Sequence, residues 1–439
     1  MKIAIVGTGY VGLVTGVCLS EIGHQVTCID VDEAKVDKMR AGISPIYEPG
    51  LDELMQKNIA AGRLFFTTSH QEGFLDAEAI YIAVGTPPRE DGTANLSYVE
   101  EVAKSIAAHI KSYTVVVTKS TVPVGTNYRI KEMISAGVEG RASFDIVSNP
   151  EFLREGTAVQ DAFQGDRIVI GSDHPKAAQI VEEINKPFGI PVYHTDISSA
   201  EMIKYASNAF LATKISFINE ISALCEKLGA NVEDVAAGMG MDKRIGSQFL
   251  RAGIGYGGSC FPKDTKALVQ IAGNVEHEFD LLKSVIQVNN KQQRLLVDKA
   301  KARFGSLEHK TVALLGLAFK PQTDDMRESA SIVVSHQLVQ EGARIQAFDP
   351  IQPEMAAQLL PPEVVLCRTL EEALTHADCV FIITDWPEFK KMDIPMASRL
   401  MKSPVFFDGR NCFSLEYAAA QGIEYHSIGR ESVGVKKSS

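Results

Sequence analysis

One thiol of the chain stands where its neighbours could activate it. The run from Gly257 to Asp264, GGSCFPKD, places Cys260 after a Gly-Gly pair and just before a predicted helix start. Pro262 suits the first turn of a helix, because its missing N–H would be unpaired there. A thiol at a helix N-terminus beside Lys263 should lose its proton more readily than a free cysteine. The glycines would let a substrate approach the backbone closely, so the segment predicts a nucleophilic cysteine.

A second motif predicts a dinucleotide site. Residues 7–12, GTGYVG, fit the pattern G-x-G-x-x-G directly after a short apolar run and at the opening of a helix. Gly7 would make the tight turn, Gly9 would admit a pyrophosphate, and Gly12 would let the helix and strand pack closely. Asp30 ends the next strand, where a carboxylate can bind ribose hydroxyls and repel a 2′-phosphate, which favours NAD over NADP. Together with Cys260, the motif predicts a dehydrogenase that holds its substrate covalently.

Two further groups of polar residues could take part in such chemistry. Lys204 and Asn208 are four residues apart, so they share one helix face and could stabilise a developing oxyanion, although a solvated helix face fits the same spacing. The run NPEFLREG places Glu151, Arg154 and Glu155 after a strand end. One of these carboxylates could act as a general base, and a surface cluster of ion pairs is the alternative.

A charged loop follows a second glycine turn near residue 316. Lys320, Asp324, Asp325 and Arg327 lie within FKPQTDDMRES. These residue types suit contacts with phosphate and sugar, and a charged loop without a ligand is the alternative. The scattered histidines show no metal-ligand spacing, so no metal site is predicted.

The elements that would position these residues alternate between strands and helices. In the first part of the chain, apolar runs at residues 3–6, 25–29, 79–84, 114–117 and 145–147 predict parallel strands. Runs at residues 311–316, 343–349 and 378–384 repeat this order, although Leu317 and Ala318 replace the glycine fingerprint. We therefore expect an α/β fold with two Rossmann-like, doubly wound domains.

A long helix is predicted between these two domains. It runs from Ser199 to Leu228 with Gly229 just past its end, about 45 Å at ~1.5 Å per residue. Such a helix could pack against a partner subunit or act as a spacer inside one chain. The predicted domains are residues 1–197, residues 198–300 with the cysteine loop, and residues 301–439.

Composition excludes several classes of protein. The 439 residues suffice for two or three domains, and the net charge of −11 argues against a nucleic-acid surface. No apolar run reaches the ~18 residues that span a membrane, and residues 1–7 favour a strand over a signal peptide. The seven cysteines lack a CxxC pair, which favours reduced thiols and a cytoplasmic location. Residues 435–439 are predicted to be disordered.

Several motifs in the same order resemble the UDP-glucose/GDP-mannose dehydrogenase family, the nucleotide-sugar 6-dehydrogenases. They are GTGYVGL, STVPVGT, NPEFLREG, GMDKRIG, GYGGSCFPKD, GLAFKPQTDDMRES and FDGRN, and they cover nearly the whole chain. The resemblance implies two Rossmann-like domains, a long helix at a dimer interface, NAD as cofactor and UDP-glucose as substrate. GDP-mannose is the nearest alternative substrate, and the context SCFPKD disfavours the UDP-N-acetylmannosamine branch. A two-electron hydroxyacid dehydrogenase and an NAD-binding regulatory protein are more distant alternatives.

The resemblance also implies catalytic roles. Cys260 would capture the aldehyde formed at the sugar C6 as a thiohemiacetal, a second oxidation would give a thioester, and water would release the uronate. Lys204, Asn208 and Asp264 would stabilise the oxyanion and assist proton transfer. Glu151 would be the base in hydrolysis, with Thr121 helping to hold the water.

The remaining implied residues bind the two ligands. Those at the cofactor are Gly7, Gly9, Tyr10, Val11, Gly12, Asp30, Lys35, Thr86, Thr121, Glu155, Lys263 and Arg327. Those at the UDP-sugar are Glu151, Phe152, Leu153, Arg154, Lys204, Asn208, Phe249, Leu250, Arg251, Ala252, Gly253, Gly257, Lys320 and Arg410. Arg244 would reach the sugar of a neighbouring subunit, so a homodimer or higher oligomer would complete the site.

Overall fold

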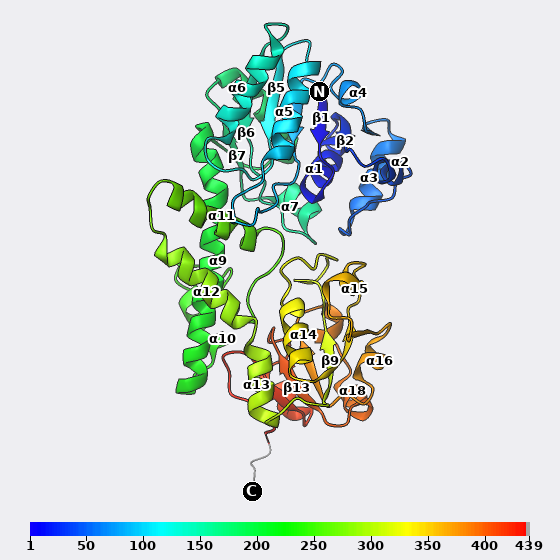
Figure 1. The fold of residues 1–439 in the computed structure, drawn as a ribbon, viewed down its shortest axis with the longest axis vertical. Coiled ribbons are helices and arrows are strands. Elements are labelled where there is room, and N and C mark those ends of the chain that lie inside the picture. Colours follow the sequence, from blue (N-terminus) through cyan, green and yellow to red (C-terminus); the bar gives the residue numbers. More distant parts are fainter. Residues whose placement is uncertain (436–439) are drawn as a thin grey trace. The chain divides into compact units, whose positions relative to one another are not determined.

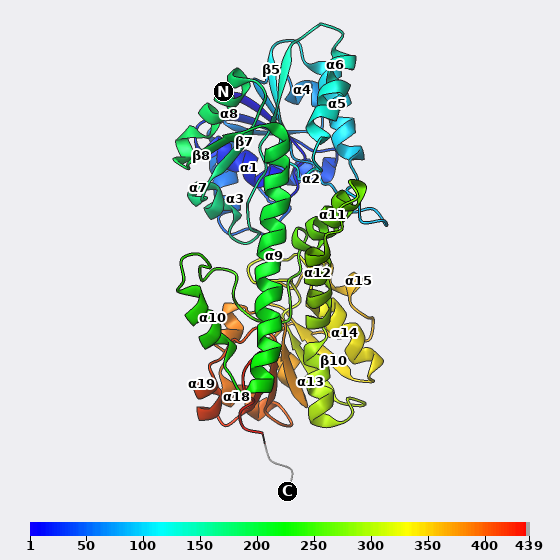
Figure 2. The ribbon, with the colours of Figure 1, turned by 90° about the vertical axis from the view of Figure 1, so that its left-hand side faces the viewer.

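The computed structural model describes residues 1–435, and the chain divides into two compact units (Figure 1). The first unit is Met1–Ser207 and the second is Asn208–Ser439. The helix α9 (Ile197–Leu228) contains the boundary between them and is unbroken (Figure 2). The disorder predicted for residues 435–439 concerns a segment that, from residue 436 on, lies outside the described residues.

The first unit is built on an eight-stranded sheet with the order β3-β2-β1-β4-β5-β6-β7-β8. The strands from β3 to β6 are parallel to their neighbours, whereas β6 and β7 meet in an antiparallel pair at Ser148 and Gly171. The strands are β1 (Lys2–Val6), β2 (Gln25–Ile29), β3 (Leu64–Thr67), β4 (Ala79–Ile82), β5 (Thr114–Thr118), β6 (Phe144–Ser148), β7 (Ile168–Gly171) and β8 (Val192–Thr195). The helices are α1 (Tyr10–Glu21), α2 (Glu33–Arg40), α3 (Leu51–Ala60), α4 (His70–Gly73), α5 (Ser97–His109), α6 (Thr126–Val138), α7 (Ala158–Gln164), α8 (Pro175–Asn185) and the 3-10 turn η1 (Lys186–Phe188).

Alternation along the central strand explains why this sheet is buried on both faces. In β1, Ile3 and Ile5 join one hydrophobic cluster, whereas Ala4 and Val6 join another. Successive side chains of a strand point to opposite faces, so an apolar run such as this one needs cover on both sides. The helices between the strands supply that cover.

The second unit contains a six-stranded, all-parallel sheet with the order β11-β10-β9-β12-β13-β14. This is the same relative order as in the first six strands of the other sheet, so the predicted fold class of two Rossmann-like domains is confirmed. The strands are β9 (Thr311–Leu315), β10 (Arg344–Phe348), β11 (Val365–Leu366), β12 (Cys379–Ile382), β13 (Val405–Asp408) and β14 (Glu424–His426). The helices between them are α14 (Ala330–Gln340), α15 (Ala356–Leu359), α16 (Leu370–Leu374), α17 (Pro387–Lys390), α18 (Ile394–Leu400) and α19 (Leu415–Ala420).

A helical segment precedes the second sheet. It consists of the C-terminal part of α9, then α10 (Val232–Gly240), α11 (Phe261–Asn274), α12 (Asp280–Gln292) and α13 (Leu295–Phe304). Ile218 of α9, Val232 of α10 and Leu296 of α13 belong to the same hydrophobic cluster as Val312 and Leu314 of β9. The 32 residues of α9 correspond to about 48 Å, so the predicted long helix is confirmed. It begins at Ile197, two residues before the predicted start, because Asp196 accepts the Ser199 N–H and caps the helix.

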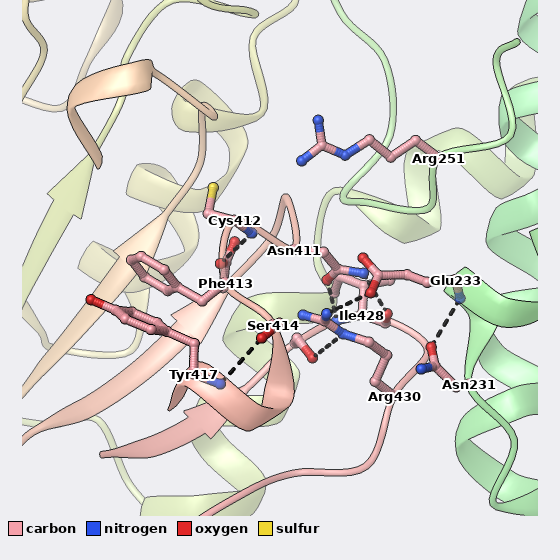
Figure 3. Close-up of polar contacts among 12 residues, drawn as sticks. Asn231, Glu233, Arg251, Asn411, Cys412, Phe413, Ser414, Tyr417, Ile428 and Arg430 are labelled. Carbon is pink, nitrogen blue, oxygen red and sulfur yellow. Dashed lines mark hydrogen bonds and ion pairs between the residues drawn. The ribbon is translucent and has the colours of Figure 1, made fainter. Parts of the chain in front are cut away.

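Buried polar contacts tie the end of the chain to α10 (Figure 3). The Arg430 guanidinium donates to Glu233 at 2.8 Å and to the Tyr425 hydroxyl at 3.0 Å. Asn411 exchanges two hydrogen bonds with the backbone of Ile428, and Tyr425 donates to Asp408 at 2.8 Å. These contacts fix the loop after β13, in which Arg410 lies.

Candidate active site

The glycine turn after β1 has the geometry that a dinucleotide phosphate requires. Gly7 has φ +95°, and a Cβ there would lie 2.8 Å from the Ala83 carbonyl oxygen. A Cβ at Gly12 would lie 1.9 Å from the Gly7 oxygen, whereas a Cβ at Gly9 would meet nothing within 4 Å. Gly7 and Gly12 are therefore needed for packing, and Gly9 leaves open space at the N-terminus of α1. This combination fits a bound pyrophosphate.

Asp30 lies at the carboxyl end of β2, beside this turn. Its Oδ2 accepts hydrogen bonds from the Thr8 backbone N at 3.0 Å, the Thr8 hydroxyl at 2.5 Å and Lys35 Nζ at 2.9 Å. Burial alone would raise the pKa of Asp30, but these donors hold it below its usual value. The anionic form is therefore favoured, as ribose binding and exclusion of a 2′-phosphate require.

A buried ion pair joins the loop after β6 to α9. Lys204 Nζ lies 2.9 Å from Glu151 Oε1, and both side chains are 5% exposed. The other Glu151 oxygen accepts the Leu153 backbone N–H at 2.6 Å. A carboxylate held in this way, with few solvent contacts, suits a general base. The sequence left two alternatives for this segment, a general base and a surface cluster of ion pairs. Glu151 is buried, which fits the first alternative, whereas Arg154 forms a surface ion pair with Asp161 at 2.5 Å.

Other predicted residues of the first unit lie at the carboxyl ends of its strands. The Thr86 hydroxyl, after β4, donates to the Thr121 carbonyl, after β5, at 2.9 Å. The Tyr10 hydroxyl accepts the Gly156 N–H at 2.6 Å, in the turn that also contains Glu155. In parallel α/β sheets ligands bind at this edge, so these contacts place the predicted residues where a ligand would lie.

The second unit places Cys260 at the start of α11. Cys260 is the N-cap residue, its carbonyl accepts the Asp264 N–H at 2.8 Å, and the Ser259 hydroxyl lies 3.6 Å from its sulfur. Pro262 occupies the first turn, so the predicted helix start is confirmed. The dipole at a helix N-terminus stabilises negative charge, as the attack of a cysteine sulfur requires.

The carboxylate of Asp264 lies one turn into the same helix and is 1% exposed. One oxygen accepts Asn208 Nδ2 at 2.7 Å and the other accepts Lys263 Nζ at 2.7 Å. Asn208 is on α9, four residues after Lys204, so the two side chains share one face of that helix. The structure thus brings together Asn208, Lys263 and Asp264 of the predicted set.

The glycines before Cys260 allow close packing within the second unit. A Cβ at Gly257 would lie 2.2 Å from the Glu328 carbonyl oxygen, and one at Gly258 would lie 2.7 Å from the Phe319 ring. Gly258 N also donates to the Arg327 carbonyl at 2.8 Å. The chain's own second glycine-turn loop packs against both glycines, and the approach of a substrate to their backbone stays a prediction. The pair fixes the cysteine turn against residues 319–328.

Comparison with known protein families matches three successive segments of the chain to domains of one family. The NAD-binding domain of the UDP-glucose/GDP-mannose dehydrogenase family matches residues 1–189, its central domain residues 198–291 and its UDP-binding domain residues 313–415. The chain belongs to this family. It is therefore an NAD-dependent oxidoreductase, and the glycine turn and Asp30 fit that cofactor.

Individual members of the family resemble the chain along almost its full length. It is 62% identical to UDP-glucose 6-dehydrogenase YwqF of Bacillus subtilis, over 99% of this chain and 98% of the relative. It is 47% identical to UDP-glucose 6-dehydrogenase of Rhizobium meliloti, over 98% of this chain and 100% of the relative. Among solved structures, a UDP-glucose dehydrogenase of Pyrobaculum islandicum has a TM-score of 0.88 at 40% identity, covering 93% of this chain and 94% of that chain.

Buried side chains hold the loop at residues 249–257, which is predicted to bind the sugar. The Asn289 amide accepts the Tyr256 N–H at 2.8 Å and donates to the Tyr256 carbonyl at 3.0 Å. Asn219 accepts the Gly253 N–H at 2.9 Å, and Gln292 donates to the Gly253 carbonyl at 2.8 Å. Leu250 and Ala252 are buried, and Phe249 has φ +62°, a conformation that a bulky residue adopts only under constraint. The loop is therefore held in one conformation.

The other charged residues of the predicted set, and Phe152, have partners within their own unit. Arg410 joins the Ile383 and Gly255 carbonyls at 2.7 and 2.8 Å, and Arg251 pairs with Asp385 at 2.8 Å. Arg327 donates to both oxygens of Asp325. The exposed Arg244 pairs with Asp242. The Lys320 ammonium lies 5.2 Å from the Phe319 ring centroid, and the Phe152 ring lies 3.7 Å from Arg167.

Sequence reasoning missed the polar residues that support these groups. Asn219, Asn289 and Gln292 occur in helices as ordinary polar residues, with no motif to single them out. Glu201 of α9 is 2% exposed and accepts the Gly125 and Asn127 N–H groups at the start of α6. Lys119, directly after β5, donates to Asn149 at 3.1 Å. Among residues 1–435 no group of three or more metal-ligating side chains occurs, and no helix there is long and apolar enough to cross a membrane.

Proposed function

We propose that this enzyme oxidises UDP-glucose at C6 to UDP-glucuronate in two NAD-dependent steps. Relatives of 42–62% identity that carry the name UDP-glucose 6-dehydrogenase support this substrate. The observation that carries the chemistry is the Cys260 thiol at the N-terminus of α11, one helical turn from a buried carboxylate that Asn208 and Lys263 hold. A two-electron alcohol dehydrogenase has no use for such a thiol.

The proposed steps assign each residue one task. NAD, when bound, accepts one hydride from C6 in each oxidation. Cys260 Sγ adds to the aldehyde carbon to form a thiohemiacetal, which keeps the intermediate from escaping or hydrating. The second oxidation leaves a thioester. Lys204 and Asn208 stabilise negative charge on the C6 oxygen, and Asp264 orients Asn208 and helps to move the proton.

Hydrolysis of the thioester completes the proposed reaction. Water gives a proton to Glu151 and its oxygen bonds to C6, with Thr121 helping to hold the water. The C6–S bond then breaks, and its electron pair leaves with Cys260 Sγ. The product ionises to the uronate, which makes the overall reaction irreversible.

Binding roles follow the same proposal. The glycine turn, Asp30, Lys35 and the other predicted cofactor residues bind NAD. The loop from Phe249 to Gly257, together with Lys320 and Arg410, binds the UDP-sugar. We also propose the three-domain division at residues 197 and 300. A cytoplasmic location is proposed as well, supported by the seven cysteines, none of which forms a disulfide in the described part of the chain.

We further propose a homodimer formed through α9. Phe210, Phe217 and Leu224 are 66%, 50% and 52% exposed and recur every seven residues, so they form one apolar stripe along the helix. Exposed aromatic residues in a row are typical of an interface. The exposed Arg244 is then available to a neighbouring subunit's sugar.

The test is NADH release from the purified enzyme with NAD and UDP-glucose, with GDP-mannose and UDP-galactose in parallel. Two NADH per UDP-glucose, with little from the other sugars, is the expected result. One NADH per sugar would contradict the thioester route. Turnover of GDP-mannose instead would keep the mechanism and replace the substrate.

A further inference from the structure

Lys119 is a partly buried lysine to which the reaction described above gives no task. It directly follows β5, whose last residue Thr118 pairs with Ser148 at the end of β6. Its ammonium donates to the Asn149 side-chain oxygen at 3.1 Å. Asn149 also donates its backbone N–H to the Thr118 carbonyl at 2.9 Å and its side-chain amide to the Val169 carbonyl at 2.8 Å. Asn149 is therefore fixed between three strands, and Lys119 supplies one of its contacts.

The position of Asn149 bears on Glu151, two residues further on. Pro150 lies between them and restricts the backbone of Asn149 to extended conformations. Glu151 is itself fixed by Lys204 Nζ and by the Leu153 backbone N–H. A displacement of Asn149 is therefore transmitted through a stiff peptide to the carboxylate.

Charge links Lys119 to the same carboxylate. Burial lowers the pKa of Lys119 to about 8, the Glu151 charge opposes that shift, and the Lys204 charge adds to it. Lys119 is thus near both members of the buried ion pair, although its hydrogen-bond partner in the described structure is an amide and not a carboxylate. A desolvated ammonium without a carboxylate partner lowers stability, and such groups occur mainly at functional sites.

We propose that Lys119 is a positioning residue for Glu151 in thioester hydrolysis, holding the Asn149–Glu151 turn and adding a second positive charge beside the carboxylate. This inference rests on the proposed function. Hydrolysis adds water oxygen to C6, transfers one proton to Glu151 and releases the electron pair of the C6–S bond to Cys260. Negative charge develops on the C6 oxygen as water adds, and two ammonium groups beside one carboxylate leave a net positive charge to stabilise it.

The variant Lys119→Met tests this role, because methionine keeps the length of the side chain and removes its charge and donor. Hydride transfer should remain fast while hydrolysis slows. We expect a rapid burst of two NADH per active site, then steady turnover reduced tenfold to a hundredfold, with a covalent UDP-glucuronyl adduct seen by intact-protein mass spectrometry. Lys119→Arg keeps the charge and should recover part of the rate.

Thr118→Val is the matched control, one residue earlier. The Thr118 hydroxyl is buried and has no hydrogen-bond partner, so the isosteric change should leave both kinetic phases unchanged. Because Lys119→Met removes a desolvated charge, its melting temperature should not fall.

Three results would overturn the inference. The first is a steady rate of Lys119→Met within twofold of wild type. The second is a lost rate without a burst and with a lowered melting temperature, which would show a structural role. The third is equal slowing of the burst and the steady rate. Failure of the proposed function is distinguishable, because wild type itself would then release one NADH per sugar or none.

Discussion

At the scale of single residues, a substitution of Cys260 distinguishes a covalent mechanism from simple hydride transfer. We expect Cys260→Ser to lower UDP-glucuronate formation at least a thousandfold, because a serine hydroxyl forms no thioester. The dissociation constant for NAD should stay within twofold, since the glycine turn is untouched. Rates come from NADH absorbance and product chromatography, and NAD binding from calorimetry. Cys367→Ser, at a partly buried thiol after β11, is the control and should retain full activity. Undiminished product from Cys260→Ser would refute the proposed nucleophile.

Lys119 also predicts a pH dependence of stability. Its folded pKa of about 8 lies below the ordinary lysine value near 10.4, so between those pH values the unfolded chain binds more protons. The free energy of unfolding contributed by this group therefore rises with pH across that window and is lowest below pH 8. Lys119→Met should be more stable than wild type at pH 7 by about 2 kcal/mol, and the difference should shrink toward pH 10.

Urea unfolding of both proteins at pH 7 and pH 10 measures this difference, and other lysines cancel in the comparison. The same experiment on Lys176→Met, at an ammonium that lies over the Tyr113 ring, is the control. A difference between Lys119→Met and wild type that is independent of pH would contradict the assigned environment.

At the scale of elements, what the sequence reveals depends on how each element is buried. The central strands β1, β4, β5, β9 and β12 were predictable, because burial on both faces requires continuous apolar runs. β8 was not predicted, since its VYHT run is partly exposed and contains a polar pair. The residues around Cys260 likewise marked it as a candidate nucleophile, whereas the role of Asp264 followed from the family resemblance. By contrast, a supporting residue such as Asn289 acts through folded neighbours 33 positions away, and no local pattern records that contact.

The loop before Cys260 offers the prediction at this scale. Asn289→Ala removes two buried hydrogen bonds to Tyr256 and leaves its N–H and carbonyl unpaired. We expect the free energy of unfolding to fall by about 1–3 kcal/mol. Because a loosened loop binds the sugar less well, KM for UDP-glucose should rise about tenfold while KM for NAD stays near wild type. Asn185→Ala, which also removes a buried amide contact, should lower stability without this selective change in KM. Equal changes in both KM values would contradict the role of the loop.

At the scale of the whole molecule, the sheets of the two units share one strand order but differ in the turns that follow β1 and β9. In the first unit Asp30 is only partly buried, and Gly9 leaves open space. In the second, Asp349 is 1% exposed, and its carboxylate accepts the Leu317 and Ala318 N–H groups and the Trp386 indole. Asp30 likewise accepts the Thr8 N–H, but only Asp349 also accepts the next backbone N–H, that of Ala318, and an indole. The acid of the second unit is therefore enclosed more fully by its own turn, and that turn leaves less room for a dinucleotide phosphate.

The apolar stripe on α9 gives the prediction for the assembled molecule. Phe210→Glu with Phe217→Glu places two carboxylates in the proposed dimer interface. Each buried aromatic anchor contributes about 2 kcal/mol or more, so the dimer dissociation constant should rise at least a thousandfold. Light scattering after size exclusion should show a monomer where wild type is a dimer. If Arg244 binds the sugar of the neighbouring subunit, KM for UDP-glucose rises in the monomer and KM for NAD does not.

The control for that pair is Met355→Glu, at a half-exposed apolar residue before α15, which should leave the mass and both KM values unchanged. Arg244→Ala in the dimer should reproduce the rise in KM for UDP-glucose without changing the mass. A dimer that survives both phenylalanine substitutions would refute α9 as the interface. A monomer with an unchanged KM for UDP-glucose would keep the interface and refute the role of Arg244, because the site would then be complete within one chain.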